Sequence, residues 1–245
     1  MFKLAWVRCV ANFRANIVAG CFIWFCGATI CLSYYNVSAF ADFLNDFGKL
    51  KSRFGLLYSA VSTAIFGGLL PYLLMYCRKS IPRKRKVSWL LFFLLFWAVK
   101  GVEVDLFYRF QDFLFGRSTD ALVVFYKVLV DQFVYCVFWS APTTAIVYGW
   151  KNADFAWKKV TVIRSLNELV SESAFLLLTT WILWIPAVSI IYAMPANLQI
   201  PMFNLTLCFF VIIISYLEPK NGGIDGTRTR NRVMFNPSRR KGFRL

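Results

Sequence analysis

The sequence predicts an all-α fold, a polytopic membrane bundle of about six transmembrane helices with interfacial amphipathic segments. Three observations lead to this prediction. The 245 residues are 59% hydrophobic and 19% aromatic, with a mean hydropathy of +0.57, which is too apolar for a soluble domain with a wet surface. Apolar runs long enough to cross a bilayer recur along the chain. Lysine and arginine fall in short clusters between these runs, as in the loops of membrane proteins.

The first apolar run, residues 17–35, carries no charge and follows a basic N-terminus. Ala39-Phe-Ala41 has the form of a signal-peptidase site, but the run is longer than a signal-peptide core of about 7–15 residues. We therefore expect a retained first helix. Residues 36–53 place aromatic and charged side chains on opposite sides of a helix, which predicts an interfacial amphipathic helix. Residues 1–53 thus form the first predicted unit.

The second predicted span, residues 54–77, contains two rows of small side chains at four-residue spacing. These rows are Ser59, Thr63 and Gly67, and Ala60, Ala64 and Gly68. Small rows let helix backbones approach closely in lipid, so we expect this face to pack against another helix. Pro71 is expected to kink or end the helix. Residues 78–86 then include six basic residues, the strongest signal of orientation in the chain.

Charged side chains enter the third and fourth predicted spans. The third begins at residues 87–99 and continues into Lys100, Glu103, Asp105 and Arg109, which can pair as Lys100 with Glu103 and Asp105 with Arg109. Residues 110–120 are expected to form a short connector. The fourth span, residues 121–148, carries Lys127, Asp131 and Gln132 in its first turns and is interrupted by Pro142. Lys127 and Asp131 are four residues apart, so they share a helix face and their charges can meet. Two interpretations stay open: solvated helix ends at the headgroup level, or the polar lining of a water-filled vestibule.

Residues 174–194 and 198–217 are the fifth and sixth predicted spans. Pro186 is expected to break the fifth helix, and Pro195 lies in a turn short enough to make a helical hairpin. The basic clusters at the N-terminus, 78–86, 149–173 and the tail would all lie on one side of a six-span protein. The positive-inside rule therefore predicts that both termini are cytoplasmic.

Residues 218–245 change abruptly to a composition rich in Gly, Asn, Arg and Pro, which predicts a disordered basic tail. Residues 225–231 can be back-translated into a sequence whose complement resembles a tRNA T-arm. One interpretation is a reading frame that continues into a neighbouring tRNA gene. The other is an ordinary basic tail that binds anionic headgroups. The genomic nucleotide sequence distinguishes them, because codons that do not encode a T-arm end the first interpretation.

Composition also argues against several classes of function. The net charge of +16 is distributed around apolar runs rather than on one polar face, so no nucleic-acid partner is expected. The chain has no histidine, and Cys21, Cys26 and Cys31 are spaced by five residues, which points them in different directions on a helix. No nucleophile-elbow or zinc-protease motif is present. We therefore expect no enzyme activity, no metal and no other cofactor.

Several motifs together resemble a known family. They are Gly67-Gly68, the basic cluster 78–86, Gly101 with Phe107-Tyr108, Lys127-Val-Leu-Val-Asp-Gln132 and Trp184-Ile-Pro-Ala187. Over residues 54–217 the chain resembles the Mpv-seventeen and peroxisomal-membrane-protein-twenty-two family of small integral membrane proteins. Asp105 stands where that family usually has histidine, and Ile185 replaces a proline. The resemblance implies a location in a peroxisomal, mitochondrial or other internal membrane, and a weakly selective channel for small solutes.

Two functions follow as hypotheses. The first is a weakly selective pore for small solutes, with Lys127, Asp131, Gln132 and the charges between residues 100 and 109 at its mouth. The second is a structural membrane protein that stabilises a complex through the small-residue face of the second span. The expected partners are the lipid bilayer, small solutes, and either a second copy of the chain or another membrane protein. The expected location is a bacterial plasma membrane or an organellar membrane.

Overall fold

The structure is a computed structural model that describes residues 2–156, 177, 181 and 183–217. Every element in these residues is helical, which confirms the all-α prediction for this part of the chain. In order, the elements are α1 (Phe2–Asn36), α2 (Ser38–Thr63), the π-helix η1 (Ala64–Leu69), α3 (Leu70–Cys77), the short 3₁₀-helix η2 (Arg83–Arg85), α4 (Lys86–Phe115), α5 (Ala121–Leu129), the π-helix η3 (Val130–Ser140), α6 (Ala141–Asn152), an unlabelled helix (Leu183–Tyr192) and α9 (Ala196–Leu217). The predicted tail, 218–245, lies outside the described residues.

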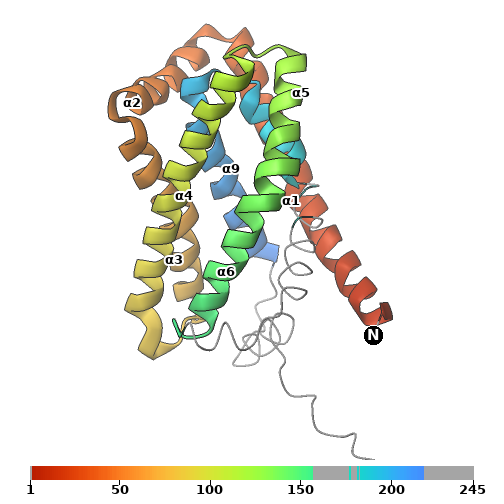
Figure 1. The fold of residues 1–245 in the computed structure, drawn as a ribbon, viewed down its shortest axis with the longest axis vertical. Helices are drawn as coiled ribbons and strands as arrows, with labels where there is room; N and C mark the ends of the chain where they lie inside the picture. The colour runs from red at the N-terminus through yellow and green to blue at the C-terminus, as the bar shows by residue number, and fades with distance from the viewer. Residues whose placement is uncertain (1, 157–176, 178–180, 182, 218–245) are drawn as a thin grey trace, which may run out of the picture.

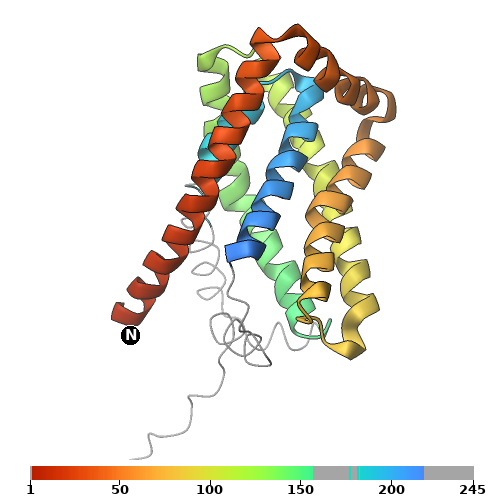
Figure 2. The ribbon, with the colours of Figure 1, turned by 180° about the vertical axis from the view of Figure 1, so that it is seen from behind.

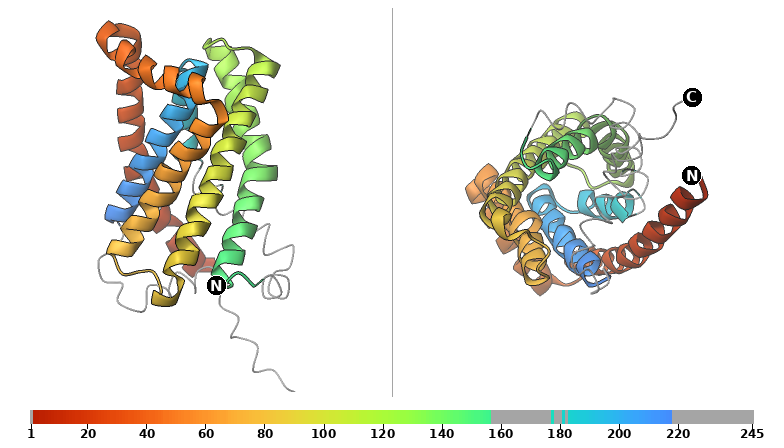
Figure 3. Two further views of the ribbon diagram at one scale, coloured as in Figure 1. Left: turned by 90° about the vertical axis from the view of Figure 1, so that its left-hand side faces the viewer. Right: turned by 90° about the horizontal axis from the view of Figure 1, so that it is seen from below.

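The helices stand side by side along the long axis of the molecule, and their connections alternate between its two ends (Figures 1 and 2). Residues 78–86 and the end of α6 lie at one end, which we call the basic end. Residues 116–120, the corner between α1 and α2, and residues 193–195 lie at the other, which we call the far end. Viewed from below, α9 and the 183–192 helix lie inside the curve of the other helices, while the N-terminal part of α1 extends outward (Figure 3).

Among the described residues, three helices are long and apolar enough to cross a membrane. They are Ser38–Cys77, Ala121–Asn152 and Ala196–Ile213. Their outer surfaces and those of α1 and α4 expose large apolar side chains, including Phe25, Leu95 and Phe138, each at least 66% exposed. Exposed apolar surface on this scale is unusual for a soluble monomer. The structure is therefore compatible with an integral membrane location.

In two of these three segments, a proline lies directly after a π-helix. Pro71 is in the first turn of α3 after η1, and Pro142 is in the first turn of α6 after η3. Proline lacks an N–H and its ring collides with the carbonyl four residues earlier, so a widened turn before it removes the conflict. Both segments therefore continue through their prolines. Pro186 also lies within a continuous helix, so the prediction that it breaks the fifth helix was wrong.

Helix α2 bends sharply at Gly55, which has φ 54° and ψ −125°. The part before Gly55 lies across the far end of the bundle, and the part after it runs down the bundle toward η1 (Figure 3). The carbonyl oxygen of Gly55 accepts hydrogen bonds from Lys51 Nζ at 3.3 Å and from Ser59 Oγ at 3.4 Å. The boundary that the sequence predicts between an interfacial helix and a span therefore coincides with a bend at Gly55.

Replacing Gly55 with alanine is expected to cost about 1–3 kcal/mol, because only glycine adopts its backbone angles without strain. An added Cβ would have only one heavy atom nearby, Arg109 Nη2 at 4.0 Å, so crowding would contribute little. Thermal unfolding in detergent measures the effect, with Ser52→Ala on the exposed side of the same helix as the control. Equal melting temperatures for the two variants would show that Gly55 does not hold this conformation.

The small-residue face of the second span packs against α4. A Cβ added to Gly67 would lie 2.5 Å from the Trp97 ring, and one added to Gly68 would lie 2.7 Å from the Phe93 carbonyl oxygen. On the α4 side, a Cβ added to Gly101 would lie 2.2 Å from the Ser59 carbonyl oxygen. The two helices therefore approach to backbone contact at several levels, as the spacing of the small residues predicts.

The most buried apolar side chains lie between residues 183 and 200, in the 183–192 helix, the turn after it and the first turns of α9. Ile191, Tyr192 and Met194 are fully buried, and they form one cluster with Val104, Tyr108, Val128 and the first half of α9. A second cluster at the basic end joins Tyr72, Phe92 and Phe93. Interior packing near the far end includes polar side chains from α4 and α5, and at the basic end aromatic rings surround the buried Lys151 of α6.

Helix α4 is longer than the sequence indicated. Residues 110–120 were expected to be a short connector, but α4 continues to Phe115 and only residues 116–120 connect it to α5. The extension adds Gln111 and Asp112 to the helix. Both side chains face into the bundle, where Gln111 is fully buried and the Asp112 side chain is 10% exposed. The extension therefore adds Asp112 to Glu103 and Asp105 as a third acidic side chain on α4.

Candidate functional site

The candidate site is a set of polar side chains on α4 and the elements that contact it, which we call the α4 network. Its members from α4 are Lys100, Glu103, Asp105, Arg109, Gln111 and Asp112, and its members from other elements are Lys51, Ser59, Lys127, Asp131, Gln132, Tyr135 and Tyr192. All seven residues proposed from the sequence as pore candidates belong to it. The network comprises three groups of contacts.

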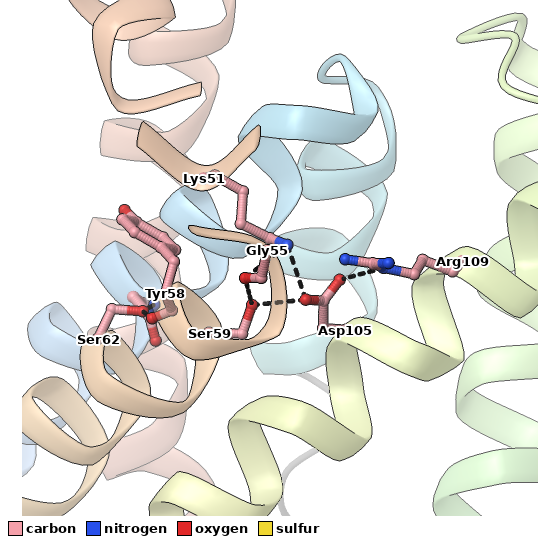
Figure 4. Close-up of polar contacts among 8 residues, drawn as sticks. Lys51, Gly55, Tyr58, Ser59, Ser62, Asp105 and Arg109 are labelled. Carbon is pink, nitrogen blue, oxygen red and sulfur yellow. Dashed lines mark hydrogen bonds and ion pairs between the residues drawn. The ribbon is translucent and has the colours of Figure 1, made fainter. Parts of the chain in front are cut away.

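The first group surrounds Asp105 where α2 bends (Figure 4). Asp105 Oδ2 lies 2.7 Å from Lys51 Nζ and accepts a hydrogen bond from Ser59 Oγ at 2.6 Å. Its other oxygen, Oδ1, lies 3.1 Å from Arg109 Nε, which confirms the predicted pairing of Asp105 with Arg109. Lys51 and Asp105 are both buried, so this carboxylate is paired with a cation inside the bundle. The group ties the bend in α2 to α4.

The second group joins α4 to η3 and α6. Lys100 Nζ lies 2.8 Å from Glu103 Oε1, which confirms the other pairing predicted on α4. Tyr135 donates a hydrogen bond to the same carboxylate, and its ring stacks on that of Phe107 at a centroid distance of 4.1 Å. Lys100 also lies 3.4 Å from Thr143 Oγ1 on α6. The Lys100–Glu103 pair of α4 therefore contacts both η3, through Tyr135, and α6, through Thr143.

The third group is centred on Lys127, and here the sequence-based pairing was wrong. Lys127 Nζ lies 2.6 Å from Asp112 Oδ1 on α4, and no ion pair in the described residues joins Lys127 to Asp131. The physical reason is the π-helix η3, which begins at Val130 and brings residues five apart next to one another. Asp131 accordingly contacts Cys136 Sγ at 3.6 Å instead of Lys127.

Asp131 is held by neutral groups. Its Oδ2 accepts a hydrogen bond from the Tyr192 hydroxyl at 2.7 Å, and its Oδ1 accepts one from Gln132 Nε2 at 2.7 Å. Gln111 Nε2 donates both to the Tyr192 hydroxyl at 3.0 Å and to the Lys127 carbonyl at 2.9 Å. These contacts form a continuous hydrogen-bonded chain from Lys127 through Gln111 and Tyr192 to Asp131.

Five members of the network were not identified from the sequence as site residues. Lys51 was assigned to an interfacial helix, Gln111 and Asp112 to a connector, and Tyr135 and Tyr192 to apolar spans. Of these, only Asp112 could have been found from local spacing. If the helix that contains Tyr108 is extended, Asp112 lies four residues further along the same face. The contacts of Lys51 and Tyr192 join segments more than 50 residues apart and leave no local pattern.

The described residues contain no cluster of acidic or cysteine side chains that could hold a metal ion. An apolar groove lies beside the network, lined mainly by α5, η3 and the 183–192 helix, including Val124, Val128, Phe133 and Ile185. None of the seven pore candidates lines this groove. The polar groups of the network therefore contact one another in the described conformation and do not border that groove.

Comparisons with known protein families, with curated proteins and with solved structures find no match for this chain. Its function is therefore inferred from the contacts described above.

Proposed function

We propose that the chain is an integral membrane protein with six spans and both termini in the cytoplasm. The proposal is supported by the three helices that are long and apolar enough to cross a membrane. It is also supported by the alternation of connections between the two ends of the bundle, with residues 78–86 and the N-terminus at the same end (Figure 1). Basic residues in loops favour the cytoplasmic side.

A cysteine at position 42 is expected to react with an impermeant thiol reagent in intact cells, whereas a cysteine at position 84 is not. The variants Asp42→Cys and Lys84→Cys, made in a background with all seven native cysteines replaced, place the new thiols on exposed side chains at opposite ends of the bundle. Permeabilised cells should label both. Labelling of position 84 alone in intact cells would mean that the orientation is inverted.

We further propose that the protein lets small solutes cross the membrane along the α4 network. The observation that carries this proposal is the burial of ionisable side chains between apolar helices: Lys51, Lys100, Asp105, Lys127 and Asp131 are all at most 7% exposed. Burying charge inside a membrane is costly, so such residues usually mark a path for ions or polar solutes.

The distribution of the network indicates where such a path would open. Asp112 lies near the far end and has a second basic neighbour, Arg117, at 3.9 Å, whose side chain is 84% exposed. Arg109 is also about half exposed. The network thus reaches exposed side chains at the far end, whereas the apolar cluster of Tyr72 and Phe92 lies at the basic end. In this conformation the paired charges form the narrow part of the path.

Swelling of protein-containing liposomes tests the proposal. Purified protein should raise the permeability to glycerol above that of protein-free vesicles, and the effect should fall for glucose and vanish for sucrose, because a path lined by paired side chains is narrow. Permeability equal to that of protein-free vesicles for all three solutes would contradict the proposal.

The alternative function is a scaffold that holds a membrane complex through the small-residue face of the second span. That face is occupied within the chain, since Gly67 and Gly68 lie against Trp97 and Phe93 of α4. The residues that motivated the scaffold hypothesis are therefore not free to contact a partner. Co-purification of a stoichiometric membrane partner, with no solute flux, would favour the scaffold over the pore.

A further inference from the structure

Asp131 differs from every other acidic residue that the described part of the bundle encloses. Asp105 lies 2.7 Å from Lys51, Asp112 lies 2.6 Å from Lys127, and Glu103 lies 2.8 Å from Lys100. Asp131 is 5% exposed, and no ion pair to it occurs among the described residues. An ionised carboxylate buried without a cation costs several kcal/mol. Its three neutral hydrogen-bond donors offset only part of this cost.

The groups that face Asp131 come from each element packed around it. Helix α4 contributes Tyr108 and Gln111, and the 183–192 helix contributes Tyr192, whose ring lies 5.1 Å from that of Tyr108. Helix η3 itself contributes Gln132, Tyr135 and Cys136. The cations nearest in sequence or along the network, Lys127 and Lys100, are each paired with another carboxylate. The surroundings of Asp131 are therefore polar and uncharged.

The geometry also limits what Asp131 can bind. A carboxylate offers about four lone-pair positions, and Gln132 and Cys136 occupy Oδ1 while Tyr192 occupies one position of Oδ2. One position on Oδ2 remains. A metal ion such as Mg²⁺ or Ca²⁺ requires about six or more oxygen ligands, which these neighbours do not supply. A proton requires one lone pair and cancels the uncompensated charge.

We propose that Asp131 is a proton-binding site inside the bundle, which takes up a proton on Oδ2 and releases it again. The proton converts the carboxylate to a neutral acid, which accepts the hydrogen bonds from Tyr192 and Gln132 more weakly than the carboxylate does. The chain of contacts from Tyr192 through Gln111 to Lys127 then links the protonation of Asp131 to the α4–α5 contact. This inference does not require the proposed solute path, because it depends only on the burial and partners of Asp131.

Labelling with dicyclohexylcarbodiimide tests the proposal, because this apolar reagent adds to protonated carboxyl groups in apolar surroundings and leaves ionised ones unmodified. The full-length protein in liposomes is treated over a series of pH values, and peptide mass spectrometry measures the modified fraction of each acidic residue. Asp131 should be modified, and the modified fraction should fall several-fold as the pH rises. Asp112, which is similarly enclosed but paired with Lys127, is the internal control and should stay unmodified.

Two outcomes would overturn the proposal. One is an unmodified Asp131 at every pH while the same preparation reacts at exposed acids such as Asp42 with a water-soluble carbodiimide. The other is equal modification of Asp131 and Asp112, which would mean that access rather than protonation controls the reaction. The variant Asp131→Asn should lose the modified peptide, which verifies the assignment. The labelling experiment does not involve solute flux, so its failure would not contradict the proposed solute path, which the liposome-swelling experiment tests separately.

Discussion

Replacing Gly101 with alanine is expected to destabilise the fold by about 3 kcal/mol or more, at or above the upper end of overpacking costs. The added Cβ would lie 2.2 Å from the Ser59 carbonyl oxygen and 2.7 Å from Thr63 Cβ. The first of these atoms is backbone and cannot rotate away, so α2 and α4 would have to separate. The intrinsic preference for alanine over glycine in a helix, about 0.5–1 kcal/mol, is too small to compensate.

Thermal unfolding in detergent measures this loss, and Gly27→Ala is the matched control. A Cβ at Gly27 would approach only the Ile190 side chain, 3.3 Å from Cδ1 and 3.5 Å from Cγ2, and no backbone atom, so that variant should stay within about 1 kcal/mol of the parent. If Gly101→Ala melts at the same temperature as Gly27→Ala, α2 and α4 do not approach as closely as described.

Asp112→Asn is expected to destabilise the protein by about 3–5 kcal/mol, because it leaves Lys127 buried without a counter-charge. The Lys127 side chain is 1% exposed, and Asp112 is its partner at 2.6 Å. Converting the pair to apolar residues of similar size, Lys127→Met with Asp112→Leu, should recover most of the stability, since a buried ion pair is often replaceable by packed apolar groups. The single change is therefore expected to be worse than the double change.

A double-mutant cycle on thermal stability measures the coupling. Lys127 should couple strongly to Asp112 and weakly to Asp131, the reverse of what their four-residue spacing suggested. The exposed pair Lys49 and Asp46, at 2.7 Å, is the control and should contribute less than about 1 kcal/mol. Strong coupling of Lys127 to Asp131 would show that η3 does not interrupt the helical register as described.

Local spacing was sufficient to predict the ion pairs within α4 and the packing face of the second span. The small-residue rows of the second span indicated a packing face, and the pairs Lys100 with Glu103 and Asp105 with Arg109 follow from residues three and four apart. The end of the interfacial helix was also predictable from the change in composition near Arg53. These features depend on neighbours in sequence, which is the information that a periodic pattern contains.

Contacts between distant segments could not be predicted in the same way. Lys51 reaches Asp105 because α2 bends at Gly55. A glycine can adopt the backbone angles of such a bend, but the presence of a glycine in the sequence does not predict that the helix bends there. In the π-helix η3, residues five apart lie next to one another instead of residues four apart. The Asp131 side chain therefore contacts Tyr192 and not Lys127. Four-residue spacing therefore identified Lys127 and Asp131 as members of the network. It paired them with each other, whereas in the π-helical segment they contact Asp112 and Tyr192.

The most direct test of the proposed function is glycerol flux through liposomes that contain the Lys127→Met and Asp112→Leu double variant. This variant should remain folded, as its melting temperature will show, but it removes a charged pair from the proposed path. A path along the α4 network predicts that its flux falls to the level of protein-free vesicles, while the surface variant Lys49→Met with Asp46→Leu keeps the flux of the parent protein. Parental flux through the folded interior variant would contradict a solute path along these residues.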